Sequence, residues 1–460
     1  MRGLFATAEL APFVKVGGLG DAASGLVKAL RRQDIEVEVV LPDYGWLPLE
    51  QTDEQSLDVP DWAGPARVRR GSLNGFGNVS LVVTPTMARP HPYNDAEGRG
   101  WPGNDTRFFS FSAAVAALAR ADAPDVLHLN DWHTGAALGF LSEPPPTVLT
   151  IHNLAYQGAA DGAWLDLIAY QAQAYEWYGG ANPLTGSIAL ADRVVTVSPT
   201  FAAEALRPAT GFGAHDALAA RGDDFSGILN GIDTEVWNPA ADPYLPVQYD
   251  VANAGRKREI GRHLSGELGW EPSTEPIIGV VTRLTDQKGV DLALEAAEAL
   301  PDLGARMVLL GSGDKDLTDE ATQTAGRLAD RFAFVEGYDE GMSHRIFGAA
   351  DLYLMPSRFE PAGLTQMQAM RYGAIPVVTD VGGLHDTVTD ADADGELGNG
   401  FVAETPSSDA VADALERAVR AWRWTKRRGE IRRRGMSHDW SWDSPATQYR
   451  ELYKEITSAR

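Results

Sequence analysis

The chain has 460 residues, more than a single hydrophobic core usually organises, so we expect two domains. It contains no cysteine, which excludes disulfides, thiolate metal sites and cysteine nucleophiles. Its formal net charge of −24 opposes binding to nucleic acids and to anionic membranes.

The charged residues also bear on the environment in which the protein works. Only seven of the 40 basic residues are lysines, namely Lys15, Lys28, Lys257, Lys288, Lys315, Lys426 and Lys454. An acidic, lysine-poor chain suggests adaptation to high salt, and a GC-rich genome that encodes arginine in place of lysine is the alternative. The sequence has neither a run of about 18 apolar residues nor a signal-peptide pattern, so we expect a cytoplasmic protein.

The first half of the chain predicts a parallel sheet with helices between its strands. An apolar strand at 4–10 leads through a glycine-rich turn into a helix at 21–32 and a second strand at 37–41. Further strands are predicted at 79–84, 126–129, 148–151 and 193–197. The rest of the span 46–103 is rich in Pro, Gly and Asp, which predicts hairpins and long loops.

The second half repeats this alternation after a proline-rich segment at 237–250, where we place the hinge. Its predicted strands lie at 277–281, 306–311, 331–337, 351–356 and 375–379, with amphipathic helices between them. Aromatic residues recur at helical spacing in 440–456, which predicts a final helix that packs on another part of the fold. Two parallel α/β domains that face each other would form a cleft, with ligands at the carboxyl ends of the strands.

The glycine-rich turn K-V-G-G-L-G-D (15–21) is the first candidate binding element. Its backbone N–H groups and the following helix N-terminus suit an anion, and Lys15 lies in the same turn. The turn also fits the G-x-G-x-x-A form of dinucleotide-binding proteins, with Asp43 twenty residues beyond Ala23. A nicotinamide-dependent oxidoreductase therefore stays open as an alternative.

Polar clusters follow two predicted strands of the first half. The segment H-L-N-D-W-H (128–133) ends one strand, and His152 follows the next. A metal site would need several converging ligands, but His128 lies within the strand while Asp131 and His133 lie beyond it. Mixed Asp, Asn and His side chains suit sugar hydroxyls better.

Two loops of the second half carry the other candidate residues. Arg283 and Lys288 lie five residues apart after the first strand and could hold a diphosphate, or could form a solvated loop paired with Asp286. Glu360 precedes a helix predicted at 365–371, where it could accept sugar hydroxyls or could be a simple helix-end charge. The free N–H groups of residues 363–365 suit a phosphate.

The segment D-A-D-A-D-G (390–395) begins like a calcium-binding loop. Its twelfth position is Phe401 rather than the expected Glu, so we expect a solvated acidic loop. The sequence contains no G-x-S-x-G, H-E-x-x-H or P-loop pattern, which argues against serine hydrolases, zinc proteases and P-loop kinases.

Six segments together resemble the glycogen/starch synthase family over nearly the whole chain. They are K-V-G-G-L-G-D (15–21), H-L-N-D-W-H (128–133), T-I-H-N-L-A-Y-Q-G (150–158), I-L-N-G-I-D-T-E-V-W-N-P (228–239), T-R-L-T-D-Q-K-G (282–289) and P-S-R-F-E-P-A-G-L-T-Q-M-Q-A-M-R-Y-G (356–373). The resemblance implies an α/β GT-B fold, in which two Rossmann-like domains face a cleft and the C-terminal helix crosses back. We expect domains at 1–238 and 239–438, with the final helix at 439–460 on the first.

The resemblance also implies a reaction. Glucose would pass with retention from a nucleotide sugar, ADP-glucose or UDP-glucose, to the non-reducing 4-OH of an α-1,4-glucan, without a metal or other cofactor. Lys15 and Gly18 would contact the diphosphate or the transferred sugar. Arg283 and Lys288 would neutralise the leaving diphosphate.

The remaining roles that the resemblance implies concern the sugar and the base. Asp131 and His152 would hold glucose hydroxyls, with the backbone near His152 close to the anomeric carbon. Glu360 would bind the 3-OH side of the sugar, Tyr338 would stack on the base, and Asn230 would lie near the site. The other expected substrate-binding residues are Asp21, Gly363, Leu364 and Thr365. Where many relatives have Cys after E-P, this chain has Ala362.

The alternatives are a related glycosyltransferase that acts on a small acceptor, the nicotinamide oxidoreductase and a non-catalytic glucan-binding protein. The last would not need Lys15, Arg283, Lys288 and Glu360 together.

Overall fold

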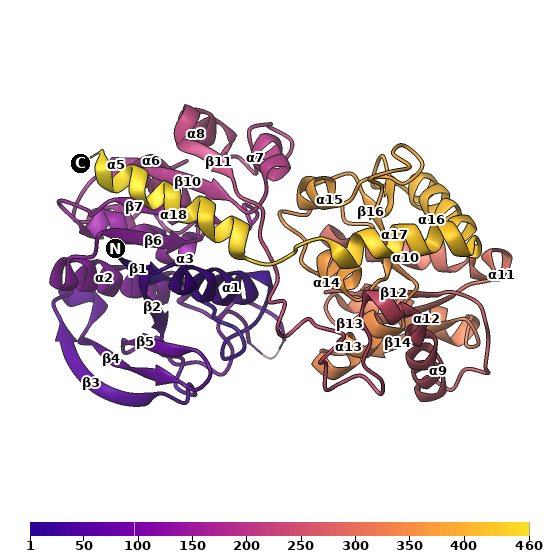
Figure 1. The fold of residues 1–460 in the computed structure, drawn as a ribbon. Helices are drawn as coiled ribbons and strands as arrows, with labels where there is room; N and C mark the ends of the chain where they lie inside the picture. Colours follow the sequence, from indigo (N-terminus) through magenta and orange to yellow (C-terminus); the bar gives the residue numbers. More distant parts are fainter. Residues whose placement is uncertain (96, 460) are drawn as a thin grey trace. The chain divides into compact units, whose positions relative to one another are not determined.

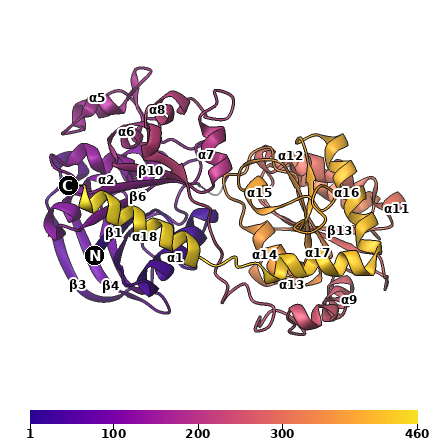
Figure 2. The ribbon, with the colours of Figure 1, turned by 45° about the horizontal axis from the view of Figure 1, so that its top comes forward.

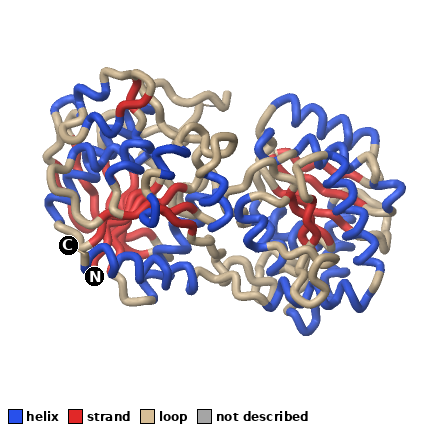
Figure 3. Tube along the Cα trace, turned by 90° about the horizontal axis from the view of Figure 1, so that it is seen from above, coloured by secondary structure: helices blue, strands red, loops and turns tan. Residues whose placement is uncertain are grey.

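The computed structural model describes residues 1–95 and 97–459 (Figure 1). Its contacts divide the chain into two compact units, Met1–Gly231 with Trp442–Arg460, and Ile232–Ser441. In each unit, strands form the interior and helices surround them (Figure 3). None of the helices in the described part of the chain combines the length and hydropathy that a bilayer crossing needs.

Unit 1 is built on a sheet that contains nine strands among the described residues, in the order β11-β10-β7-β6-β1-β2-β5-β4-β3. All neighbours from β11 to β5 are parallel, whereas β4 and β3 are antiparallel additions at one edge. The strands are β1 (Arg2–Ala6), β2 (Glu36–Pro42), β3 (Glu50–Leu57), β4 (Ala66–Leu73), β5 (Gly77–Val83), β6 (Val126–Asn130), β7 (Thr147–Ile151), β10 (Arg193–Thr196) and β11 (Phe225–Gly227), and β8 (Glu176–Trp177) and β9 (Gly180–Ala181) form a separate hairpin.

The helices of unit 1 connect these strands, and the last one comes from the end of the chain. They are α1 (Gly18–Arg32), α2 (Asn104–Asp122), α3 (Trp132–Gly135), α4 (Trp164–Leu167), α5 (Ala172–Tyr175), α6 (Pro183–Leu190), α7 (Pro199–Ala205), α8 (His215–Ala219) and α18 (Asp443–Ser458). The long α2 is buried along most of its length because its sequence is apolar on all sides.

Unit 2 is a six-stranded, entirely parallel sheet within the described residues, in the order β14-β13-β12-β15-β16-β17. Its strands are β12 (Ile277–Val281), β13 (Arg306–Gly311), β14 (Phe332–Glu336), β15 (Leu352–Met355), β16 (Ile375–Thr379) and β17 (Phe401–Ala403). Its helices are α9 (Lys257–Glu267), α10 (Val290–Ala297), α11 (Leu300–Leu303), α12 (Lys315–Arg327), α13 (Glu340–Ala349), α14 (Thr365–Arg371), α15 (Gly382–Thr387), α16 (Ser408–Arg423) and α17 (Thr425–Ser437).

Two separate cores cover the two faces of the unit 2 sheet. Along β13, Met307 and Leu309 belong to one core, and Val308 and Leu310 belong to the other. This alternation follows from the two-residue period of a strand, and it explains why the strands read as continuous apolar runs. The predicted pair of doubly wound, Rossmann-like units is confirmed.

Three local predictions need correction. The first strand ends at Ala6 rather than residue 10, and α1 begins at Gly18 rather than Asp21. The hairpins predicted in the span 46–103 are confirmed by the antiparallel pairing of β3 with β4, although the exposed, polar sequence of β3 gives no signal for its bounds. The segment 237–250, predicted to be the hinge, packs into unit 2, where Trp237 and Tyr249 are buried. The boundary between the two units lies before it, between Gly231 and Ile232.

Helix α18 returns to unit 1, where it lies beside α1 (Figure 2), as the sequence predicts for a returning C-terminal helix. His128, in the middle of β6, holds it from below: Nδ1 lies 2.5 Å from the Tyr453 hydroxyl and Nε2 lies 2.7 Å from the Thr150 hydroxyl. Burial lowers the pKa of His128 to about 3, so its ring is neutral. His128 is therefore part of the core rather than of a ligand site.

Gly25 makes the close packing of α1 and α18 possible. A Cβ at this position would lie 2.0 Å from Nε1 of Trp442, the residue that precedes α18. We expect Gly25→Ala to destabilise the protein by about 1–3 kcal/mol, because overpacking outweighs the gain in helix propensity of roughly 1 kcal/mol.

Gly429 in α17 provides the matched control, since a Cβ there meets no atom within 4 Å. Gly429→Ala should stabilise by roughly 0.5–1 kcal/mol. Urea unfolding of both variants measures the difference, and a Gly25→Ala protein as stable as the wild type would contradict the packing argument.

Candidate active site

In unit 1, three neighbouring strands end beside one another and carry the predicted site residues. Strands β7, β6 and β1 are adjacent in the sheet, and β1 has β2 on its other side. The chain therefore continues from β1 to β2 on one side of the sheet and later adds β6 and β7 on the other side. Open parallel sheets bind their ligands at such a point, where the order of the strands reverses. The glycine-rich turn follows β1, Asp131 follows β6 and His152 follows β7.

The glycine-rich turn is held from within by Glu9, a residue that sequence analysis missed. One Glu9 oxygen, Oε2, accepts hydrogen bonds from the backbone N–H groups of Val16 (2.8 Å) and Gly17 (3.0 Å). The other, Oε1, accepts a hydrogen bond of 2.8 Å from the Tyr93 hydroxyl. Burial raises the pKa of Glu9 above its ordinary value, although these hydrogen bonds oppose the shift. An acidic residue inside the apolar run at 4–10 is the only sequence signal for this role.

Lys15 and Asp21 form an ion pair across the same turn. Nζ of Lys15 lies 3.0 Å from Oδ1 of Asp21, and each side chain is about one quarter exposed, at 24% and 26%. Gly18 is the first residue of α1, so the N–H groups near it have no intrahelical acceptor. The turn therefore presents a lysine, held by Asp21, beside the N-terminus of a 15-residue helix.

Asp131 and His152 are brought together at the ends of β6 and β7. Oδ1 of Asp131 accepts a hydrogen bond of 2.7 Å from the His152 backbone N–H. Asp131 has a φ of 55°, a left-handed conformation that costs energy for a residue other than glycine and that concentrates at functional sites. The carboxylate is thus fixed in place by both the backbone and its hydrogen bond.

The His152 ring has a defined protonation state. Its Nε2 lies 2.9 Å from Oδ1 of Asn130, whose amide nitrogen donates to the Ala6 carbonyl. Since an amide oxygen only accepts, Nε2 carries the ring proton. Burial lowers the pKa of His152 to about 3, so the ring is neutral and its Nδ1 is an acceptor. Asn130 was not predicted as a site residue, and it orients His152.

His133, the last residue of the segment 128–133, packs inside unit 1 and is not exposed at the carboxyl edge of the sheet. It is buried, its ring stacks on Tyr93 with centroids 5.0 Å apart, and burial lowers its pKa to about 3. Its Nδ1 has no hydrogen-bond partner among the described residues. The sugar-binding interpretation of this segment therefore rests on Asp131.

In unit 2, the corresponding edge lies at the ends of β12 and β15, which are neighbours in the sheet with β13 on the other side of β12. Nζ of Lys288 lies 2.5 Å from Oε2 of Glu360, and both side chains are largely buried, with exposed fractions of 16% and 7%. The Ser357 hydroxyl donates to the same carboxylate oxygen at 3.2 Å. Oε1 of Glu360 makes no hydrogen bond to any residue that the structure describes, so it remains available as an acceptor.

Gly289 allows the two loops of unit 2 to approach so closely. It has a φ of 62°, and a Cβ there would lie 2.0 Å from the Pro356 carbonyl oxygen. Any other residue would separate the loop that carries Lys288 from the loop that carries Glu360. Lys288 and Glu360, predicted to act separately, therefore form one ion pair.

Arg283 differs from Lys288 because it is exposed and has no ion-pair or hydrogen-bond partner for its side chain in residues 1–95 and 97–459. The alternative in which Arg283 and Lys288 pair with Asp286 is wrong. Asp286 lies 3.3 Å from Arg358, which also binds Asp291 at 2.6 Å. Arg358 holds the loop together, and Arg283 is left with its charge facing solvent.

The other predicted residues of unit 2 surround this edge. Gly363 has a φ of 66°, and Leu364 and Thr365 begin α14. Tyr338, between β14 and α13, is 69% exposed. Asn230 is buried in unit 1, where its N–H donates to the Val197 carbonyl at 3.2 Å, and in the described part of the chain no hydrogen bond joins it to Asp131 or His152.

A metal ion finds no ready-made site in the described residues, because no three His, Asp or Glu side chains converge there. That the protein works without a metal stays a prediction, tested below with a chelator.

The pKa of Asp131 yields a stability prediction. Burial raises this pKa to about 7, above the value of about 3.9 in an unfolded chain. Between these values the folded state holds the proton more tightly, so ionisation destabilises the folded protein as the pH rises from about 4 to about 7. Asn cannot ionise but can still accept the hydrogen bond from His152. We therefore expect Asp131→Asn to be more stable than the wild type at pH 8.

This stability difference should shrink as the pH falls from 7 to 5, by up to about 1.4 kcal/mol per pH unit. Urea unfolding of both proteins at pH 5, 6, 7 and 8 provides the measurement. A difference that stays constant over this range would show that Asp131 ionises normally.

Comparisons with known proteins cover both units. Residues 3–220 match the starch synthase catalytic domain, and residues 269–435 match glycosyl transferases group 1. A glycogen synthase from Halorhodospira halophila is 41% identical over 480 residues, covering 100% of both chains. Another, from Dechloromonas aromatica, is 38% identical over 99% of each chain.

Solved structures agree with these matches. The catalytic domain of starch synthase IV from Arabidopsis thaliana, bound to ADP and acarbose, has a TM-score of 0.89 and 34% identity, and the match covers 99% of each chain. Sucrose-phosphate synthase from Thermosynechococcus elongatus, at 20% identity and a TM-score of 0.64, shares the fold alone. The chain therefore belongs to the glycogen/starch synthase family of glycosyltransferases.

Proposed function

We propose that this enzyme lengthens an α-1,4-glucan with glucose from ADP-glucose, with retention at the anomeric carbon. Full-length identity to glycogen synthases supports the reaction. ADP bound to the Arabidopsis relative favours ADP-glucose over UDP-glucose. The observation that carries the assignment of residues is the arrangement at the ends of β12 and β15, where an unpaired arginine neighbours a buried lysine–glutamate pair.

Arg283 and Lys288 neutralise the leaving diphosphate. As the bond between the anomeric carbon and the phosphate oxygen breaks, negative charge grows on that oxygen, and nearby cations stabilise the transition state more than the ground state. The exposed side chain of Arg283 is available to the diphosphate. The N–H groups of Gly363, Leu364 and Thr365, at the start of α14, donate to the same diphosphate.

Glu360 positions the glucosyl group. Its Oε2 is held by Lys288 and Ser357, which leaves Oε1 to accept a hydrogen bond from the sugar on its 3-OH side. Lys288 thus joins the two halves of the donor, since it touches the carboxylate that holds the sugar and approaches the phosphate that leaves.

Residues of unit 1 bind the transferred glucose. Asp131 and the neutral His152 supply acceptors for its hydroxyls, and the backbone near His152 lies against the anomeric carbon. Lys15 and Gly18 contact the diphosphate or the sugar, and Asp21 keeps Lys15 in position. Tyr338 stacks on the base, and Asn230 lies near the substrate.

The donor assignment is tested by product release. In excess EDTA, the purified enzyme should release ADP from ADP-glucose when glycogen is added, and the glycogen chains should lengthen. UDP-glucose should be a much poorer donor at equal concentration. Transfer to a sugar phosphate but not to glycogen would favour the small-acceptor alternative, and activity that EDTA abolishes and Mg²⁺ restores would overturn the metal-free assignment.

Arg283→Ala separates a catalytic from a structural role. We expect kcat to fall by on the order of 10² to 10³, the loss typical of one transition-state charge contact, with a smaller change in the KM for the donor. The melting temperature should not change, because the side chain is exposed and unpaired.

Arg420→Ala is the matched control, since Arg420 is also an exposed arginine without a partner in the described structure and lies on α16. It should keep full activity. Lys288→Ala, in contrast, should lose both activity and stability, because it leaves Glu360 buried without its partner. Normal turnover in Arg283→Ala would contradict the proposed role.

A further inference from the structure

Unit 2 has a hollow that is not part of the candidate active site. Its volume is about 390 Å³, within the range of about 300–1,000 Å³ that is usual for small-molecule sites. It lies between the loop 390–400 and the first turns of α17. Its lining consists of Ala391, Gly395, Trp424, Lys426, Arg427, Glu430, Ile431 and Arg434.

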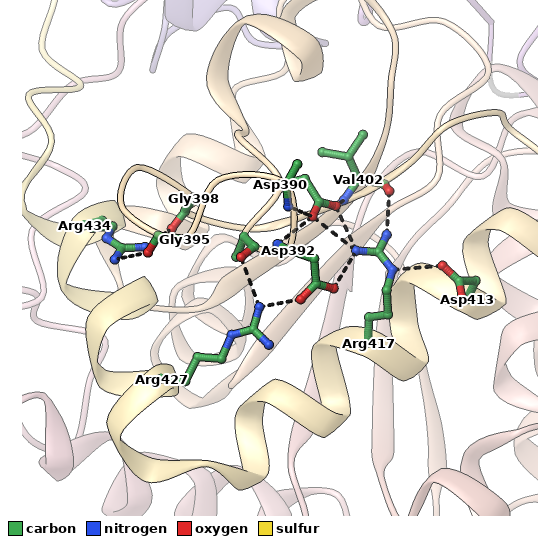
Figure 4. A network of polar contacts seen from close by, with 11 residues as sticks. Asp390, Asp392, Gly395, Gly398, Val402, Asp413, Arg417, Arg427 and Arg434 are labelled. Carbon is green, nitrogen blue, oxygen red and sulfur yellow. Dashed lines mark hydrogen bonds and ion pairs between the residues drawn. The ribbon is translucent and has the colours of Figure 1, made fainter.

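The loop beside the hollow is fixed by arginines (Figure 4). Arg417 binds Asp390 at 2.9 Å and Asp392 at 3.0 Å, and Arg427 binds Asp392 and the Ala391 carbonyl. The predicted acidic loop is largely exposed to solvent, but two of its three aspartates are paired with arginines, which the sequence did not predict. A loop held in this way gives the hollow a preformed wall.

Arg434 fixes the far end of the same loop. It donates to the carbonyl oxygens of Gly398 at 2.7 Å and Gly395 at 2.8 Å. Arg427 and Arg434 therefore direct hydrogen-bond donors to the loop rather than to a ligand. The charge of Arg427 is partly offset by its ion pair with Asp392, and that of Arg434 by the nearby Asp394.

Three side chains of the lining remain available to a ligand. Trp424 is 66% exposed, although aromatic rings are usually buried. Lys426 and Glu430 make no hydrogen bond or ion pair with any described residue, and they lie four residues apart on α17, hence on one face. The free charges are thus one positive and one negative.

We propose that this hollow binds a segment of α-glucan chain apart from the site of transfer. A sugar ring stacks on the Trp424 indole, and Lys426 and Glu430 exchange hydrogen bonds with its hydroxyls. An anion would meet only one free cation, with Glu430 beside it, and an apolar ligand would leave both charges unsolvated. A neutral polyol satisfies all three side chains.

This inference rests on the proposed function, because an α-1,4-glucan is the acceptor. A second attachment point raises the effective concentration of a long polymer near the enzyme, but a short oligosaccharide gains nothing if it cannot occupy both sites. The hollow should therefore affect reactions with glycogen and leave reactions with maltotriose unchanged.

Trp424→Ala tests the stacking. The dissociation constant for glycogen, measured without donor by retardation in native gels, should rise on the order of tenfold, which corresponds to about 1.4 kcal/mol. The KM for glycogen should rise in parallel, while kcat and the KM for maltotriose stay at wild-type values. Trp424→Phe should restore most of the binding, and Arg420→Ala, outside the hollow, should bind like the wild type.

Three outcomes would overturn the inference. In the first, Trp424→Ala binds glycogen like the wild type. In the second, Trp424→Ala loses activity on maltotriose as well. In the third, inorganic phosphate displaces glycogen from the wild type but not from Lys426→Ala, and this result would identify an anion site. The proposed function fails separately, if the wild type itself releases no ADP with any glucan.

Discussion

Parallel strand pairing is the constraint on which the arrangement of both units depends. Strands that run in one direction end at one edge of the sheet, so the segments after β1, β6 and β7 must meet, as must those after β12 and β15. The crossover helices that make this pairing possible also cover both faces, which leaves the carboxyl edge as the open surface. The shared direction of the strands, more than any single loop, decides where a site can form.

Charges at these two edges are managed in different ways. Unit 1 buries carboxylates, and burial raises the pKa values of Glu9 and Asp131, so ionised forms exist there at the expense of stability. At the edge of unit 2, the buried carboxylate of Glu360 is paired with Lys288, and the Arg283 side chain is exposed to solvent. An accessible Arg283, with the nearby carboxylates either paired or destabilised by burial, favours the arrival of a negative ligand, as the proposed function requires.

The sequence predicts most of the fold and the positions of the site residues, because both depend on local patterns. Apolar runs followed by Gly, Asp or His identify strand ends, and the candidate site residues lie there. Contacts between distant segments are a different matter. Neither the pairing of Lys288 with Glu360 nor the support that Glu9 and Tyr93 give to the glycine-rich turn leaves a periodic signal.

Edge and loop elements were also beyond the reach of periodicity. Strand β3 is polar and almost wholly exposed, so it has no apolar alternation, and the sequence predicted hairpins in this span without the bounds of β3 and β4. The loop 390–400 looked like a solvated acidic segment because its partners, Arg417 and Arg427, lie on helices further along the chain. In each case the missing information is which remote side chain faces the segment.

The position of α18 has a consequence for folding during synthesis on the ribosome. Unit 1 begins with the first residue but includes the chain from Trp442 onward, so the face of α1 around Gly25 stays uncovered until synthesis is complete. Unit 2 is made in between, which takes roughly 10–40 s at about 5–20 residues per second. During that interval the second unit can finish folding while the first, although made earlier, still exposes apolar surface. Unit 1, although its first part is made earlier, can therefore complete its core only after the segment from Trp442 onward has been made.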